Sequence, residues 1–122
     1  MTASGQTTIV PAAALLSAWQ AHGWENGLSL DRLGPLDRLL VRTRHSVYDI
    51  IVSSPSTGDV RVRGGAYFPA FTPARLAGST LGGSFVKVRA LHLGFRLEFT
   101  VGAQFVLTSA VQSIEVIAAA RE

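Results

Sequence analysis

The chain has 122 residues, of which 48% are hydrophobic and 16% are charged, and eleven basic residues stand against eight acidic ones. This length fits one domain with a modest core. The absence of cysteine excludes a disulfide framework, thiol catalysis and metal sites built on thiolates. His22, His45 and His92 lie far apart in the sequence, so we expect neither a metal site nor a cofactor.

The low proportion of charge predicts contact with another chain. A charged fraction below the usual value of about 25% indicates that part of the apolar surface is covered, so we expect a homo-oligomer. The alternative is an alanine-rich composition that raises the apolar count without large patches. No apolar run approaches the roughly 18 residues of a membrane span, and no basic residue precedes Arg32 to begin a signal peptide. We therefore expect a cytoplasmic protein without membrane association.

Residues 1–36 predict a helix and a connector outside the main fold. Pro11–His22 is the expected helix, because proline suits its first position, Gly23 suits its end, and apolar residues including Trp19 fall on one side. The glycines and the proline of Trp24–Leu36 predict a connector. This segment is an appendage to the main fold or an arm that reaches a neighbouring subunit.

After the connector the apolar residues alternate, which is the period of a β-strand. Leu39–Thr43 and Val47–Ser53 predict two strands, or one long strand bent near His45. Ser54–Gly58 supplies turn residues, and the alternation resumes in Asp59–Arg63. We therefore predict a β-hairpin here, with valines inward and arginines outward.

The middle of the chain predicts less regular structure. Ala66–Ser84 contains two prolines and several glycines, so we expect it to be mostly irregular, with a short helical turn at Thr72–Ala77. Phe85–Arg89 alternates again and predicts a strand with Val86 and Val88 inward.

The last third predicts further strands. The apolar residues of Leu91–Val101 occupy odd positions, whereas those of the preceding strand occupy even ones, so a bulge or corner is expected near Arg89–Leu91. Gly102–Ala103 predicts a turn, and Gln104–Thr108 and Ala110–Ile117 predict the final strands.

These elements predict a mainly β protein with a short N-terminal helix. Six or seven sequential strands joined by short turns are typical of a small antiparallel β-barrel or roll. We assign the barrel or roll to residues 37–117 and a tail to residues 118–122.

Three basic doublets at i, i+2 spacing lie within the strand-like segments, so each points to one face of a sheet. If adjacent strands bring them together, they form a surface for an anionic ligand or for nucleic acid. The alternative is a solvated outer face on which arginine stems cover apolar surface. The candidate binding residues are these doublets and the one aromatic residue in step with the first of them: Arg42, Arg44, Tyr48, Arg61, Arg63, Lys87 and Arg89.

A second candidate is the glycine-rich stretch near residue 80, whose backbone N–H groups could face an anion. It lacks the lysine and the order of a Walker A loop. The alternative is a set of turns or close backbone approaches that require glycine. The candidate residues are Gly78, Ser79, Gly82, Gly83 and Ser84.

Arg42–Asp49 places a histidine, a serine and an aspartate within eight residues, a composition found in hydrolases. In an extended strand His45 and Ser46 face opposite ways, which opposes a base–nucleophile pair. We therefore expect a non-enzymatic binding or assembly module that presents an arginine-rich sheet face to an anionic partner. The alternatives are a barrel that binds single-stranded nucleic acid and, third, a small enzyme centred on residues 42–49.

Overall fold

The computed structural model describes residues 27–81, 86–117 and 119, and this part of the chain is mainly β. Within it, no helix is long and apolar enough to cross a membrane. The helix expected at Pro11–His22 lies outside the described residues. The elements in chain order are β1 (Leu28–Ser29), the 3-10 turn η2 (Leu30–Arg32), β2 (Arg38–Thr43), β3 (Val47–Ser54), β4 (Asp59–Gly64), β5 (Phe68–Thr80), β6 (Lys87–Val88), β7 (Ala90–Leu91), β8 (Arg96–Val101) and β9 (Gln104–Ile117).

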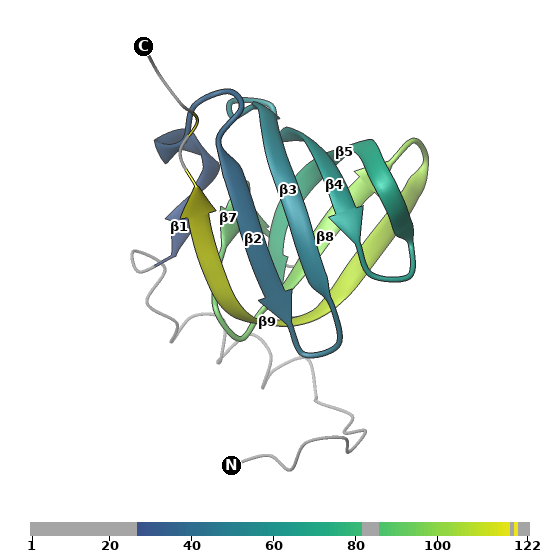
Figure 1. Ribbon diagram of the computed structural model, residues 1–122. Coiled ribbons are helices and arrows are strands. Elements are labelled where there is room, and N and C mark those ends of the chain that lie inside the picture. Colours follow the sequence, from purple (N-terminus) through teal and green to yellow (C-terminus); the bar gives the residue numbers. More distant parts are fainter. Residues whose placement is uncertain (1–26, 82–85, 118, 120–122) are drawn as a thin grey trace.

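Six of these strands form a closed antiparallel ring. The sheet order is β4-β3-β2-β9-β8-β5-β6, and an additional pairing between β4 and β5 joins its two sides (Figure 1). The expected hairpin is confirmed, because β3 and β4 pair antiparallel from Tyr48↔Gly64 to Ser54↔Asp59. Ring closure satisfies the backbone groups that would otherwise line an open sheet edge.

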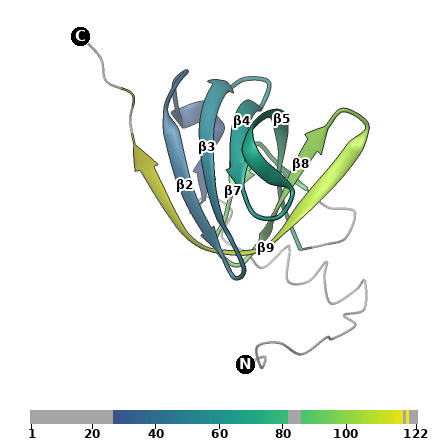
Figure 2. The same ribbon diagram turned by 45° about the vertical axis from the view of Figure 1, so that its right-hand side comes forward.

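Two long strands, β5 and β9, make the corners of the ring. The first half of β9 pairs with β8 and the second half with β2. In the same way β5 pairs first with β4 and then with β8. Register shifts interrupt these pairings, and such bulges bend a strand and increase its twist. Figure 2 shows both strands curving strongly from one side of the ring to the other.

The core lies inside the ring and follows the alternation of the strands. Val60 and Val62 of β4 point inward and are buried, as predicted. Across from them an aromatic cluster fills the interior, with ring centroids of Tyr48 and Phe99 6.3 Å apart and those of Phe68 and Phe99 5.7 Å apart. The apolar residues of this core are Leu30, Leu39, Val41, Tyr48, Ile50, Val52, Val60, Val62, Phe68, Leu76, Leu91, Leu97, Phe99, Val106 and Val111.

Part of the expected connector belongs to the core. β1 pairs with β7 through Leu28↔Leu91, and the backbone N–H of Leu30 donates to the carbonyl of Arg89 at 2.9 Å. The side chain of Leu30 is completely buried. This short segment therefore covers one side of the ring rather than merely leading to it.

The prediction of irregular structure and a helical turn within Ala66–Ser84 is wrong. Residues 68–80 form β5, and the residues expected to be helical pair with β4 as Val62↔Thr72 and Asp59↔Arg75. The first half of β5 pairs with β4 on one side, and pairing with β8 begins at Arg75. Pro69 and Pro73 therefore lie where the strand has one paired edge, which is the setting that tolerates proline.

The predicted slip near Arg89–Leu91 is confirmed, but the side chains around it are placed differently. Arg89 has a φ of 49°, and the chain changes there from β6 to β7. Val88 was expected inward, but it is exposed. It lies in β6, a two-residue strand that pairs with β5 at the edge of the sheet. Leu93 is also exposed, since it lies in the turn between β7 and β8.

Candidate functional site

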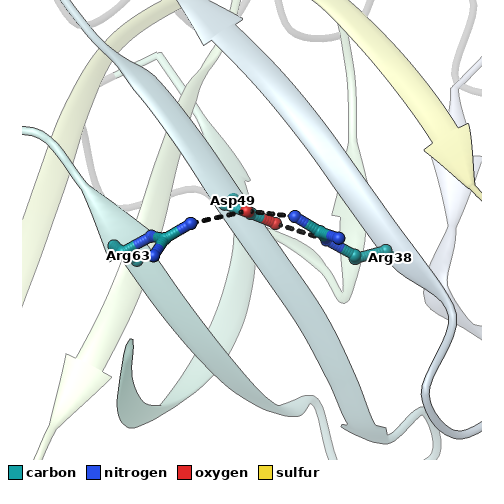
Figure 3. A network of polar contacts seen from close by, with 3 residues as sticks. All are labelled: Arg38, Asp49 and Arg63. Atoms are coloured by element: carbon teal, nitrogen blue, oxygen red, sulfur yellow. Dashed lines mark hydrogen bonds and ion pairs between the residues drawn. The ribbon is translucent and has the colours of Figure 1, made fainter. Parts of the chain in front are cut away.

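The outward arginines of β2 and β4 meet at one carboxylate. Asp49 on β3 accepts hydrogen bonds from Arg38 Nε at 2.9 Å and Nη2 at 2.5 Å, and from Arg63 Nη2 at 3.3 Å (Figure 3). The Asp49 side chain is 11% exposed. Hydrogen bonding from Arg38 lowers the pKa of the Asp49 carboxyl below its ordinary value, against the opposing effect of burial, and the charge of Arg63 adds to the lowering. The same contact raises the pKa of Arg38.

Two basic residues of the doublets, Arg63 and Arg89, form ion pairs within the protein. Arg63 also lies over the ring of Phe71, with its guanidinium carbon 4.4 Å from the ring centroid. Arg89 forms an ion pair with Asp31 at 3.4 Å. Lys87 is exposed on the short strand β6. These three basic residues therefore lie in different environments.

Tyr48 does not lie on the face of Arg42 and Arg44, and that prediction is wrong. The turn at residues 44–46 reverses the chain, and Tyr48 pairs with Val41 on the inner side of the sheet. Its side chain is 7% exposed and packs in the aromatic cluster. Counting alternate positions through a turn does not preserve the face of the sheet.

Other arginines form no ion pair among the described residues, and three of them gather around the turn between β2 and β3. Ala110 of β9 accepts the backbone N–H of Arg44 at 3.0 Å and pairs with Arg96 of β8. Arg44 and Arg96 therefore flank Ala110 on opposite sides, roughly 10 Å apart at two strand spacings. We call Arg42, Arg44, His45 and Arg96 the hairpin cluster; all four are exposed.

Two adjoining hollows lie at this cluster and share Arg44 and His45. The larger has a volume of about 360 Å³ and is lined by Arg44, His45, Arg96, Leu107, Thr108, Ser109 and Ala110. The smaller, of about 250 Å³, is lined by Arg42, Thr43, Arg44, His45, Ser46, Val47 and Gln112. Neither lining contains a carboxylate, so the described surface here combines positive charge with hydroxyl and amide groups.

A hydroxyl network holds the turn in place. Ser109 Oγ accepts the backbone N–H of His45 at 3.1 Å and donates to Thr43 Oγ1 at 2.8 Å. Thr43 Oγ1 in turn lies 3.1 Å from both the backbone nitrogen and the carbonyl oxygen of Ser46. The side chains of the hairpin cluster therefore project from a fixed backbone, which reduces the ordering that a ligand must impose.

Arg42 and Arg44 were predicted from the sequence, whereas Arg96 and Ser109 were not. The predicted turn at Gly102–Ala103 was a usable signal, because hairpin register from that turn places Arg96 opposite Ser109 or Ala110. The approach of β9 to β2 was not visible, since it joins segments far apart in the chain.

The glycine-rich stretch is not a loop at its start. Gly78 and Ser79 lie in β5, and Ser79 Oγ donates to the carbonyl of Ala90 at 2.7 Å and accepts from the backbone N–H of His92 at 3.1 Å. Gly78 has a φ of 147°, and a Cβ there would overlap the carbonyl of Lys87. Close backbone approach therefore explains this glycine. Gly82, Gly83 and Ser84 lie outside the described residues.

The remaining candidates lie elsewhere. Arg61 lines a separate hollow of about 470 Å³, together with Asp59 and Arg75, which form their own ion pair at 3.5 Å. In the part of the chain that the structure describes, no hydrogen bond joins the side chains of His45 and Ser46 to each other or to Asp49. The contacts of residues 42–49 are those of a fixed turn next to a structural ion pair.

The comparisons with known proteins leave the chain without a relative to argue from. No protein-family model, curated protein or solved structure matches it. The function of the chain has to follow from the chemistry of its own site.

Proposed function

We propose that this protein is a binding module whose hairpin cluster holds a phosphate-bearing polyanion. The observation that carries the proposal is the gathering of Arg42, Arg44 and Arg96 around two hollows whose linings contain no carboxylate. Arginine presents planar, bidentate donors that match phosphate oxygens. The division among the arginines supports this assignment, because Arg38 and Arg63 share an ion pair with Asp49 while the cluster has no such partner among the described residues.

The shape of the site favours a polymer over a small molecule. Small-molecule sites are concave and bury most of their ligand. Here two hollows lie side by side at an exposed turn and share Arg44 and His45, so an extended anion can occupy both. The hydroxyl group of Ser46 and the amide group of Gln112 add hydrogen-bond donors beside the cations.

The test uses inorganic polyphosphate and a charge-neutralising variant. Arg44→Gln with Arg96→Gln removes two positive charges from the larger hollow, and we expect polyphosphate affinity at about 50 mM salt to fall at least tenfold. The matched control, Arg32→Gln with Arg61→Gln, removes the same charge away from the cluster and should change the affinity less than threefold. Equal losses in the two variants would show a response to net charge alone and would contradict the proposal. Binding is measured by isothermal titration calorimetry.

Self-association remains a prediction of the composition. Several large apolar side chains are exposed in the described structure, among them Leu36, Val116 and Ile117. Multi-angle light scattering measures the mass directly. A monomer at about 100 μM would contradict this part of the proposal, because a stable assembly forms well below that concentration.

A further inference from the structure

An apolar strip leads away from the hairpin cluster along the outside of β9. Phe105 is 72% exposed and Leu107 is 46% exposed, whereas Val106 and Thr108 between and beyond them point into the core. Alternation therefore places Phe105 and Leu107 on one outer face. We call these two residues the β9 strip. The β9 strip thus presents an aromatic ring to solvent in line with an aliphatic side chain.

The β9 strip and the hairpin cluster form one continuous surface. Leu107 lines the same hollow as Arg44, His45 and Arg96. Phe105 follows on the same face of the strand, two positions further from the cluster. Phe105 and Ala110 are five positions apart along β9, which corresponds to roughly 16 Å of extended strand. Figure 1 shows β9 sweeping along the lower side of the ring to the turn between β2 and β3.

We propose that this combined surface binds single-stranded nucleic acid, with a base stacked on Phe105 and the phosphates held by the hairpin cluster. The inference rests on the proposed function and identifies the polyanion. Surfaces that bind single strands combine a cationic track with exposed aromatic rings, because every base has a face that can stack. A duplex hides those faces, so Phe105 would find no partner on it.

The position of Glu98 determines where the phosphates and the bases of the bound nucleic acid lie. Glu98 pairs with Leu107 across β8 and β9, between Phe105 and the arginines. A carboxylate repels phosphate, so the sugar–phosphate backbone stays at the hairpin-cluster end of the surface, beyond Glu98, and the bases face the β9 strip. A glutamate in this place can accept a hydrogen bond from an amino group of a base.

A membrane surface is the other partner with both charge and apolar character. Binding to a bilayer requires a substantial apolar face to enter the boundary between headgroups and acyl chains. Here the strip consists of only Phe105 and Leu107, and the exposed amide of Gln112 lies beside the cations and offers hydrogen bonds to a nucleotide. The observations therefore favour nucleic acid, and anionic vesicles serve as a comparison in the test.

The test compares Phe105→Ala with Phe105→Tyr by fluorescence anisotropy on a labelled single-stranded oligonucleotide of about twelve nucleotides, within the usual site size. We expect Phe105→Ala to weaken oligonucleotide binding about tenfold, since stacking on one aromatic ring has this order of effect. Phe105→Tyr, which keeps the ring, should stay within about twofold of the original protein. Thermal melting of each variant checks the fold, which a 72% exposed side chain leaves unchanged.

Polyphosphate and salt separate this inference from the proposed function. Phe105→Ala should bind polyphosphate normally, and its logarithmic salt dependence on the oligonucleotide should keep the original slope, because no charge is lost. Arg44→Gln with Arg96→Gln should reduce that slope.

Normal oligonucleotide binding by Phe105→Ala, with polyphosphate binding intact, would overturn the inference and leave the proposed function standing. Absence of binding to both probes at about 50 mM salt would overturn both. Binding to vesicles of anionic phospholipid that depends on Phe105, without oligonucleotide binding, would assign the surface to a membrane and also overturn the inference.

Discussion

Replacing Asp49 by asparagine removes the charge that joins Arg38 of β2 to Arg63 of β4 across the outer face of the sheet. The carboxylate is 11% exposed and accepts three hydrogen bonds from the two guanidinium groups. Charge-assisted hydrogen bonds contribute roughly 1.5–3 kcal/mol when buried. The arginine side chains are about half exposed, which reduces the contribution toward that of surface pairs.

We therefore expect Asp49→Asn to lower the free energy of unfolding by about 1–2 kcal/mol at neutral pH. For a domain of about 60–100 residues this corresponds to a fall in Tm of roughly 4–16 °C. The matched control is Asp59→Asn, whose ion pair with Arg75 at 3.5 Å is exposed on both sides. It should cost less than about 0.5 kcal/mol. Both are measured by thermal and urea unfolding followed by far-UV circular dichroism.

The pH dependence of the Asp49 effect has a definite sign. The pKa of this carboxyl is lowered in the folded protein, so the folded state favours the ionised form. Its contribution is complete above the unfolded pKa of about 4 and is lost as the pH falls through the folded pKa. The difference in stability between the original protein and Asp49→Asn should thus shrink below about pH 5. An undiminished difference at acid pH, or a Tm equal to that of Asp59→Asn, would refute the reasoning.

Three further substitutions test other features of the structure. Gly78→Ala should lower the free energy of unfolding by about 2 kcal/mol or more, because its Cβ would overlap the Lys87 carbonyl. The control in urea unfolding is Gly102→Ala, which has open space at its Cβ. Equal midpoints for the two variants would contradict the packing argument. Asp37→Ala should cost about 2–3 kcal/mol in the same assay, since the buried carboxylate accepts two backbone N–H groups, from residues 34 and 119, each at 2.8 Å. Ser109→Ala releases the turn below the hairpin cluster and should weaken polyphosphate binding about threefold by titration calorimetry; unchanged affinity would show that the hydroxyl network has no part in binding.

Local patterns were sufficient to predict the hairpin of β3 and β4. Its valines and arginines alternate without interruption, and turn residues separate the strands. The two long corner strands, β5 and β9, were harder to predict from the sequence, for different reasons. Pro69 and Pro73 led to a prediction of irregular structure. Local propensity does not reveal that the first half of β5 has one unpaired edge, where a residue without a backbone N–H is tolerated. For β9, two predicted strands are one, because a bulged strand looks like two segments in a one-dimensional pattern.

The candidate site shows the same limit. Arg42 and Arg44 were identified from their spacing, and they are exposed as predicted. Arg63 has the same spacing, but it forms an ion pair with Asp49 of the adjacent strand. Whether a basic residue is free to bind depends on cross-strand neighbours, which follow from register rather than from position in the chain.

The pairing of Arg38 with Ile117 means that the earliest and latest strands of the ring are neighbours. A nascent chain leaving the ribosome at roughly 5–20 residues per second carries β2 for several seconds before β9 is made. During that interval one backbone edge of β2 has no strand to pair with, and such unpaired edges form hydrogen bonds with other unfolded chains. Closure of the ring thus waits for β9, and molecules truncated before β9 should be substrates for chaperones rather than smaller folded versions of the same domain.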